Sequence, residues 1–101
     1  MTLEEIIRAG KGKAGSEQSW EVTRTDNGNV GRLFHYSTQM LVWDWYDPAN
    51  ESVLDYSIGW GSVSDQGGMN KAFRILGLPL YYARKGGAEI IHIARYGGHN
   101  G

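Results

Sequence analysis

The chain of 101 residues contains no cysteine. This absence excludes disulfide bonds, thiolate nucleophiles and zinc sites built from cysteine. The chain also lacks any apolar run near the ~20 residues needed to cross a bilayer. Its start, MTLEEIIRAG, is acidic and amphipathic, whereas a secretory signal has a basic start and a continuous apolar run. We therefore expect a soluble protein of the cytoplasm with no membrane partner.

A strong excess of either charge is also missing, since the formal net charge is −1. Attraction of the whole molecule to nucleic acid or anionic lipid is not expected, and any such binding would need a local patch. The charges are nevertheless separated along the chain. Residues 41–70 carry acids and no Lys or Arg, and these acids are Asp44, Asp47, Glu51, Asp55 and Asp65. From residue 71 onward there is one acid, Glu89, beside the basic residues Lys71, Arg74, Arg84, Lys85 and Arg95.

Recognisable catalytic, metal and cofactor motifs are missing as well. The three histidines show no H-x-H or H-x-x-x-H spacing, so no metal site is predicted. The Gly67-Gly68 pair lacks the spacing of a dinucleotide or phosphate loop, so no cofactor is predicted. Neither Ser37 nor Ser62 lies in a G-x-S-x-G nucleophile motif.

Two neighbouring carboxylates offer one alternative, an acid/base pair or a divalent-cation site. Asp44 and Asp47 lie near the end of a predicted strand, where residues three apart point to opposite faces. Asp47 also precedes Pro48, a favoured arrangement for the first residues of a turn. A structural role is therefore favoured. A small hydrolase or nuclease that uses Asp44, Asp47, Asp55 and a histidine remains the third functional hypothesis.

Aromatic residues are abundant, with four Trp and six Tyr. Each can bury about 150–250 Å² of surface, so a few of them can fill the core of a small domain. The same residue types are enriched in binding hot spots. Length and composition together predict a single domain over residues 1–101.

The periodicity of apolar residues predicts the elements. Thr2 and Glu5 form a capping box for a short helix that ends at Gly10, and a polar linker follows over residues 11–18. A second helix is predicted by the apolar spacing of Met69, Ala72, Phe73 and Leu76, with Ser64 or Asp65 as its N-cap and Gly77 at its end. Alternating patterns predict strands over 19–24, 30–36, 39–46, 52–60, 80–85 and 88–95.

The order α-β-β-β-β-α-β-β, with short turns between consecutive strands, indicates an α+β fold. We expect a mainly antiparallel sheet of about five to six strands, one helix packed on a face, and a short N-terminal helix. An open antiparallel sheet leaves edges that can pair with another chain, so a homodimer is among the predicted states.

Basic and aromatic residues near the C-terminal half are the candidate contact residues. Lys71 and Arg74 share the polar face of the second helix, and Trp60 precedes that helix. The tip of the last predicted hairpin adds Tyr81, Tyr82, Arg84 and Lys85. These residues support two hypotheses, a non-enzymatic binder of another protein and a single-stranded nucleic acid binder in which charge follows the backbone and rings stack on bases.

Three segments between His35 and Ala88 carry a resemblance: HYSTQMLVWDW, YSIGWGSVSDQGGMNKAF and LGLPLYYARKGG. This pattern resembles a group of small, uncharacterised proteins found in bacteriophage genomes, and it covers about half of the chain. The resemblance implies a phage accessory protein that acts in the bacterial cytoplasm by binding and blocking a host protein, including components of antiviral defence, as anti-CRISPR inhibitors do. It implies no catalytic motif and no particular site residue.

Overall fold

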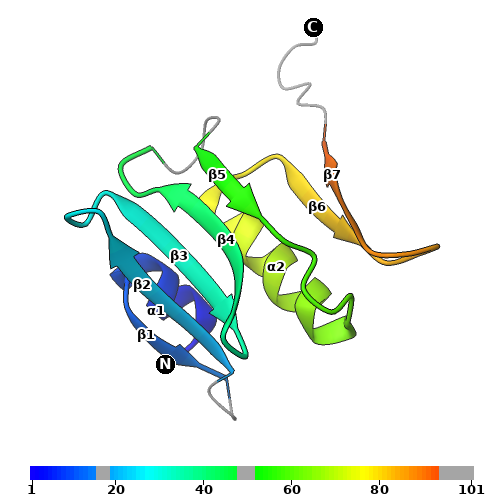
Figure 1. The fold of residues 1–101 in the computed structure, drawn as a ribbon, viewed down its shortest axis with the longest axis horizontal. Coiled ribbons are helices and arrows are strands. Elements are labelled where there is room, and N and C mark those ends of the chain that lie inside the picture. Colours follow the sequence, from blue (N-terminus) through cyan, green and yellow to red (C-terminus); the bar gives the residue numbers. More distant parts are fainter. Residues whose placement is uncertain (16–18, 48–51, 94–101) are drawn as a thin grey trace, which may run out of the picture.

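The computed structural model describes residues 1–15, 19–47 and 52–93. Glu51, Arg95 and His99 lie outside these ranges. The fold is α+β, as predicted, with two helices on one face of a five-stranded antiparallel sheet (Figure 1). The helices are α1 (Leu3–Ala9) and α2 (Val63–Leu76). The strands are β1 (Gly12–Ala14), β2 (Trp20–Thr25), β3 (Val30–His35), β4 (Thr38–Asp44), β5 (Val53–Tyr56), β6 (Leu80–Ala83) and β7 (Glu89–His92).

The strands form two sheets. The first has the order β1-β2-β3-β4-β5, with every neighbouring pair antiparallel, and β6 pairs only with β7 in the second. The backbone of Tyr82 in β6 bonds to α2, because Asn70 Oδ1 accepts from its N–H at 2.7 Å and the Asn70 amide donates to its carbonyl at 3.1 Å. The last hairpin therefore attaches to the helix, and it lies beyond α2 on the side away from β1 (Figure 1).

Strand β1 falls in the segment that we predicted as a linker. Its three residues pair with β2, with Lys13 opposite Glu21 and Ala14 opposite Trp20. A strand of three residues is too short to show a period of two. Its pairing depends on the neighbouring β2, so local sequence does not predict it.

Helix α1 forms as predicted. The Thr2 hydroxyl accepts from the Glu5 N–H at 3.1 Å, and the Glu5 carboxylate accepts from the Thr2 N–H at 2.7 Å. Gly10 ends the helix in the left-handed conformation. The apolar face of this two-turn helix is buried against the rest of the molecule through Leu3, Ile6 and Ile7, which supplies the stability that so short a helix lacks alone.

Helix α2 begins earlier than predicted. Its N-cap is Ser62, whose hydroxyl accepts from the Asp65 N–H at 3.0 Å, and Asp65 is the reciprocal partner in the capping box. The prediction of Ser64 or Asp65 as N-cap was therefore wrong by two to three residues, because the S-x-x-D pattern places the cap at its first position. Gly77 ends the helix in the left-handed conformation, as predicted.

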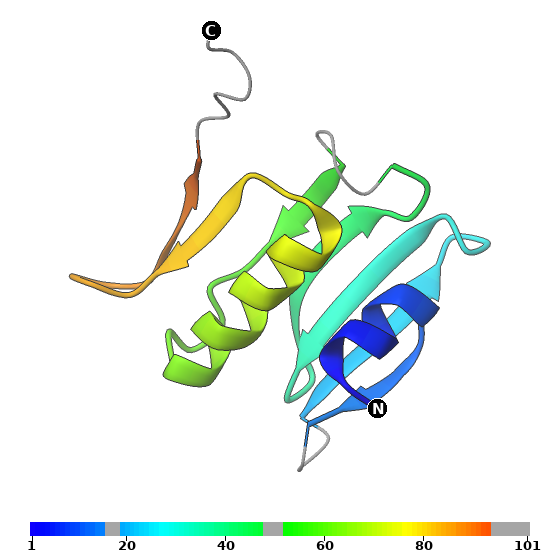
Figure 2. The same ribbon diagram turned by 180° about the vertical axis from the view of Figure 1, so that it is seen from behind.

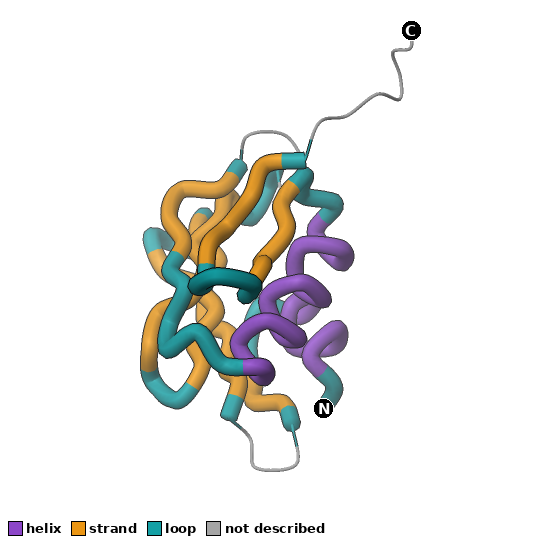
Figure 3. Tube along the Cα trace, turned by 90° about the vertical axis from the view of Figure 1, so that its right-hand side faces the viewer, coloured by secondary structure: helices purple, strands orange, loops and turns teal. Residues whose placement is uncertain are grey.

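The core lies between the helices and the sheet. Figure 2 shows α1 and α2 side by side in front of the sheet, and Figure 3 shows the helices and strands as two layers. Trp43, 1% exposed, is among the largest buried side chains and packs over Gly31, where any Cβ would collide with the indole. Neither helix in the described ranges is long and apolar enough to span a membrane.

Candidate functional site

Trp60 has a large side chain that is exposed to solvent. It lies in the loop between β5 and α2 and is 59% exposed. Its backbone N–H donates to Asp65 Oδ2 at 2.9 Å, and the Ser62 N–H donates to the same oxygen at 3.1 Å. Gly59 precedes it with a positive φ, and a Cβ there would crowd Met40 and Asp65. The loop is thus closely packed beneath an exposed indole.

The carboxylate of Asp65 is fully buried and also binds His35. Its Oδ1 lies 2.6 Å from His35 Nδ1, and the two side chains are 0% and 1% exposed. Burial acts to raise the pKa of Asp65, but the hydrogen bonds from His35, Ser62 and Trp60 outweigh it and hold the pKa below its ordinary value. Asp65 is therefore a carboxylate, which only accepts hydrogen bonds, so His35 Nδ1 carries the donated proton.

Aromatic rings enclose His35. Its ring stacks on Trp20, with the centroids 3.9 Å apart and the planes 8° apart, and it lies 4.5 Å from the Tyr36 ring and 6.1 Å from the Trp60 ring. The other ring nitrogen, Nε2, is buried without a hydrogen-bond partner among the described residues. A general base must reach the proton that it removes, and His35 is buried away from solvent. The His35–Asp65 pair therefore has a structural role beneath Tyr36 and Trp60.

Tyr36 and Trp60 form an exposed aromatic pair next to the buried His35–Asp65 pair. Tyr36 is 57% exposed, and its ring lies 6.0 Å from the Trp60 ring in an edge-to-face arrangement. Tyr36 and Ser37 make the two-residue turn between β3 and β4, both with positive φ. This conformation favours Asn-Gly and costs on the order of 1 kcal/mol for each residue with a side chain. The tertiary packing therefore holds Tyr36 in place.

The tip of the last hairpin reaches the same loop. Arg84 Nε donates to the Gly61 carbonyl at 2.8 Å, directly after Trp60. Lys85 is exposed beside it at the tip. We call Tyr36, Trp60 and Arg84 the Trp60 surface. Of the residues predicted for contact, Trp60 and Arg84 thus belong to the same loop contact. Lys85 directly follows Arg84 in the chain.

Two adjacent tyrosines of β6 differ in their exposure to solvent. Tyr81 is 45% exposed, whereas Tyr82 is 0% exposed and belongs to the core. The Tyr82 hydroxyl donates to the Ile58 carbonyl, and burial, followed by the nearby charge of Asp65, raises its pKa. The prediction of Tyr82 as a contact residue does not fit this position, because its side chain is not exposed to solvent.

Lys71 and Arg74 lie elsewhere on α2. Both are exposed, and they follow Val63 by eight and eleven residues, which corresponds to about 12 and 16 Å along a helix. Lys71 lines a shallow hollow together with Trp20 and the N-terminal residues. The structure therefore separates these two basic residues from the Trp60 surface.

Two carboxylates of the hydrolase hypothesis bond to the backbone of residues that follow them in the chain. Asp44 Oδ1 accepts from the Tyr46 N–H at 3.0 Å, and Asp55 Oδ1 accepts from the Tyr56 N–H at 2.9 Å. Within the described ranges, no group of three His, Asp or Glu residues is placed to hold a metal ion. The histidine that does pair with a carboxylate, His35, pairs with Asp65 instead.

Comparison of the chain with protein-family models, with curated proteins and with solved structures found no match. Function is therefore inferred from the geometry of the described residues. Two parts of that geometry were not predicted from the sequence, the exposed ring of Tyr36 and the His35–Asp65 pair. A Tyr-Ser dipeptide carries no turn signal. The S-x-x-D pattern at Ser62 was a readable sign that Asp65 belongs to a cap.

Proposed function

We propose that this chain is a non-enzymatic binding protein that contacts another protein through the Trp60 surface. One observation carries the proposal: the exposed indole of Trp60 contacts the rings of Tyr36 and His35, and its backbone is held by the buried carboxylate of Asp65. Trp, Tyr and Arg are the residues most enriched in binding hot spots, and all three occur here. A side chain that is already ordered loses less entropy on binding, which supports affinity.

The bacteriophage resemblance suggests the class of partner. In that interpretation the partner is a host protein in the bacterial cytoplasm, and the chain is an accessory protein that modulates it, with components of antiviral defence as one class of target. A homodimer paired through a sheet edge remains a compatible assembly. The hydrolase hypothesis gains no support, because two of its carboxylates, those of Asp44 and Asp55, each accept from the backbone N–H of a residue just after them in the chain.

Affinity capture from nuclease-treated bacterial lysate tests the proposal. Wild-type bait, Trp60→Ala and the matched control Tyr46→Ala, another exposed aromatic residue at 70% exposure, would be compared by mass spectrometry. We expect a protein that wild type and Tyr46→Ala capture and that Trp60→Ala loses. With the purified partner, Trp60→Ala should weaken affinity about 30-fold or more, as for a hot-spot residue. Equal capture by all three baits would contradict the proposal.

Single-stranded nucleic acid binding is the alternative function. It is favoured by the exposed Tyr36–Trp60 ring pair and by Arg84, which binds the carbonyl of Gly61 directly after Trp60, since rings and nearby charge form a stacking platform. It would show as affinity for a labelled single-stranded oligonucleotide that falls steeply as salt is raised. Absence of binding at low salt would remove it.

A further inference from the structure

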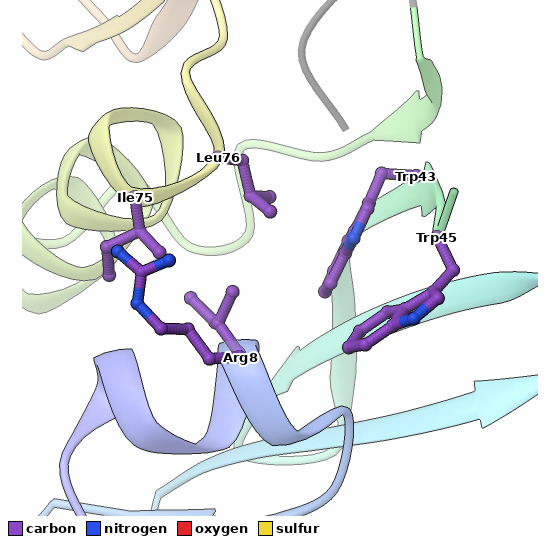
Figure 4. A pocket seen from close by; sticks show the side chains of 6 residues that line it. Arg8, Trp43, Trp45, Ile75 and Leu76 are labelled. Carbon is purple, nitrogen blue, oxygen red and sulfur yellow. The ribbon is translucent and has the colours of Figure 1, made fainter. Parts of the chain in front are cut away.

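A second surface feature lies on the far side of α2 from the last hairpin. It is a cleft of about 270 Å³ between α1, the C-terminal half of α2 and the end of β4 (Figure 4). Five apolar residues and one arginine line it: Ile7, Arg8, Trp43, Trp45, Ile75 and Leu76. This volume is slightly below the range of small-molecule sites, which run from about 300 to 1,000 Å³, so only a small ligand would fit.

The aromatic wall of the cleft is built rigidly. Trp43 is buried over Gly31. Trp45 is fixed at its backbone, whose N–H donates to the Asn29 carbonyl at 2.9 Å, and at its ring, where the guanidinium of Arg24 lies 4.1 Å from the centroid. A flat apolar group could contact the partly exposed ring of Trp45, which the buried Trp43 packs beside, without reordering either ring, and such preorganisation favours binding.

The opposite wall carries the charge. In Figure 4 Arg8 and Ile75 line one side of the cleft, across it from the two indoles. Arg8 Nε bonds Glu4 Oε2 at 2.8 Å, and both side chains are largely exposed, at 62% and 51%. Glu4 therefore engages Nε, and the terminal nitrogens of Arg8 keep donors for a second carboxylate. None of the residues that line the cleft is acidic.

We propose that this cleft binds a small amphiphilic carboxylate, with its flat apolar body against the partly exposed Trp45 and Ile75, next to the buried Trp43, and its carboxylate on Arg8. The rings and Ile75 supply apolar contact, and Arg8 supplies a planar fork that matches a carboxylate. A neutral or cationic analogue of the same shape would lack this second interaction. The site is separate from the Trp60 surface and does not depend on the function proposed for it.

The test is a titration of the ¹⁵N-labelled chain with 3-phenylpropanoate and with its neutral amide, followed by nuclear magnetic resonance. The indole N–H signals of Trp43 and Trp45 should shift, while that of Trp60 should not. We expect a dissociation constant for the acid no weaker than about 1 mM, the range for a small efficient ligand. The amide should bind at least about 3-fold more weakly, since it loses a charge-assisted hydrogen bond.

Two surface variants locate the carboxylate. Arg8→Gln should abolish the preference for acid over amide, and Glu4→Gln should raise affinity for the acid, because it removes the competing carboxylate. Both changes break only an exposed ion pair, which contributes about 0–1 kcal/mol to stability, so the fold should persist. Lys13→Gln, the same charge change on an exposed residue of β1, is the control and should behave as wild type.

Three results would overturn the proposal. The first is no shift of the Trp43 and Trp45 indoles at millimolar acid. The second is equal affinity for acid and amide in wild type. The third is a wrong response of the variants. The preference for acid over amide could persist in Arg8→Gln, fall equally in Lys13→Gln, or stay unaffected by Glu4→Gln. Any of these outcomes would mean that the ligand carboxylate does not bind Arg8.

Discussion

Asp65 connects three parts of the molecule through one carboxylate. It caps the first turn of α2 with Ser62, fixes the backbone of Trp60, and binds His35 of β3. A buried charge is tolerated only when it is paired and fully hydrogen-bonded, and here both oxygens have donors. The buried carboxylate of Asp65 therefore holds the loop that carries the exposed Trp60.

The depressed pKa of Asp65 predicts a pH dependence of stability. Because the folded-state pKa lies below its ordinary value of 3.8, the unfolded chain takes up the proton first as pH falls. The stabilisation by the Asp65 carboxylate is thus present above about pH 4 and is lost as pH falls through the folded-state pKa. Asp65→Asn should lower the free energy of unfolding by about 3 kcal/mol at pH 7, and by progressively less below pH 4.

Urea unfolding of both proteins between pH 7 and pH 2.5 measures this difference. Asp55→Asn, a change at an exposed carboxylate of β5, should give a small difference at every pH. If the gap between wild type and Asp65→Asn stayed constant across the range, Asp65 would not be ionised with the role assigned to it.

Helix α2 contains two adjacent glycines that have different reasons to be there. Glycine in a helix interior is about 1 kcal/mol less favourable than alanine. At Gly68 a Cβ would overlap the indole of Trp20, so the helix can approach β2 only without a side chain at that position. At Gly67 an added Cβ would meet nothing within 4 Å, and its φ is ordinary for a helix.

These neighbouring positions should respond oppositely to alanine. Gly67→Ala should raise the free energy of unfolding by up to about 1 kcal/mol through helix propensity. Gly68→Ala should lower it by about 1–3 kcal/mol, because the added methyl forces the helix away from Trp20. Thermal or urea unfolding of the two variants checks this, and each serves as the control for the other. A stabilised Gly68→Ala protein would mean that α2 does not pack closely on Trp20.

Local sequence signals explain which elements were predictable. The capping box of α1 and the apolar spacing of α2 are encoded within a few residues, and both helices form as expected except that α2 begins two to three residues earlier than predicted. Strand β1 depends on a partner rather than on its own pattern. In β6, adjacent residues must face opposite sides, so only one of Tyr81 and Tyr82 could be exposed, and the sequence did not say which.

The candidate site was less predictable because it is assembled from distant segments. His35 and Asp65 are 30 residues apart, and only the packing of α2 on the sheet brings them together. Trp60 and Arg84 were predicted for contact from residue type and from their places in a loop and near a hairpin tip, and the docked hairpin bonds Arg84 to Gly61, the residue after Trp60. No local pattern could have indicated that Lys71 and Arg74 lie apart from them.

At the scale of the whole molecule, α2 joins two sheets that do not pair with each other. Its apolar side packs into the core with the five-stranded sheet, and its polar side holds β6 through Gln66 and Asn70. A two-stranded hairpin is marginally stable alone. The hairpin therefore depends on these side-chain bonds and on the buried ring of Tyr82, whereas the larger sheet does not.

This difference predicts that Asn70→Ala loosens one sheet and leaves the other. The change removes the two Asn70 bonds to the Tyr82 backbone. Gln66 still donates to the Tyr82 carbonyl, but the Tyr82 N–H loses its acceptor, and the docked hairpin should be destabilised by about 1–3 kcal/mol, the cost of leaving a buried backbone group unpaired. Hydrogen exchange should then speed up in β6 and β7 and stay unchanged in β2, β3 and β4. Lys71→Ala, at the adjacent exposed position of α2, should leave exchange unchanged throughout. Faster exchange in all strands of the Asn70→Ala protein would instead mean that the two sheets unfold as one cooperative unit, and the Trp60 surface, which spans the sheet and the hairpin, would then share the stability of the whole.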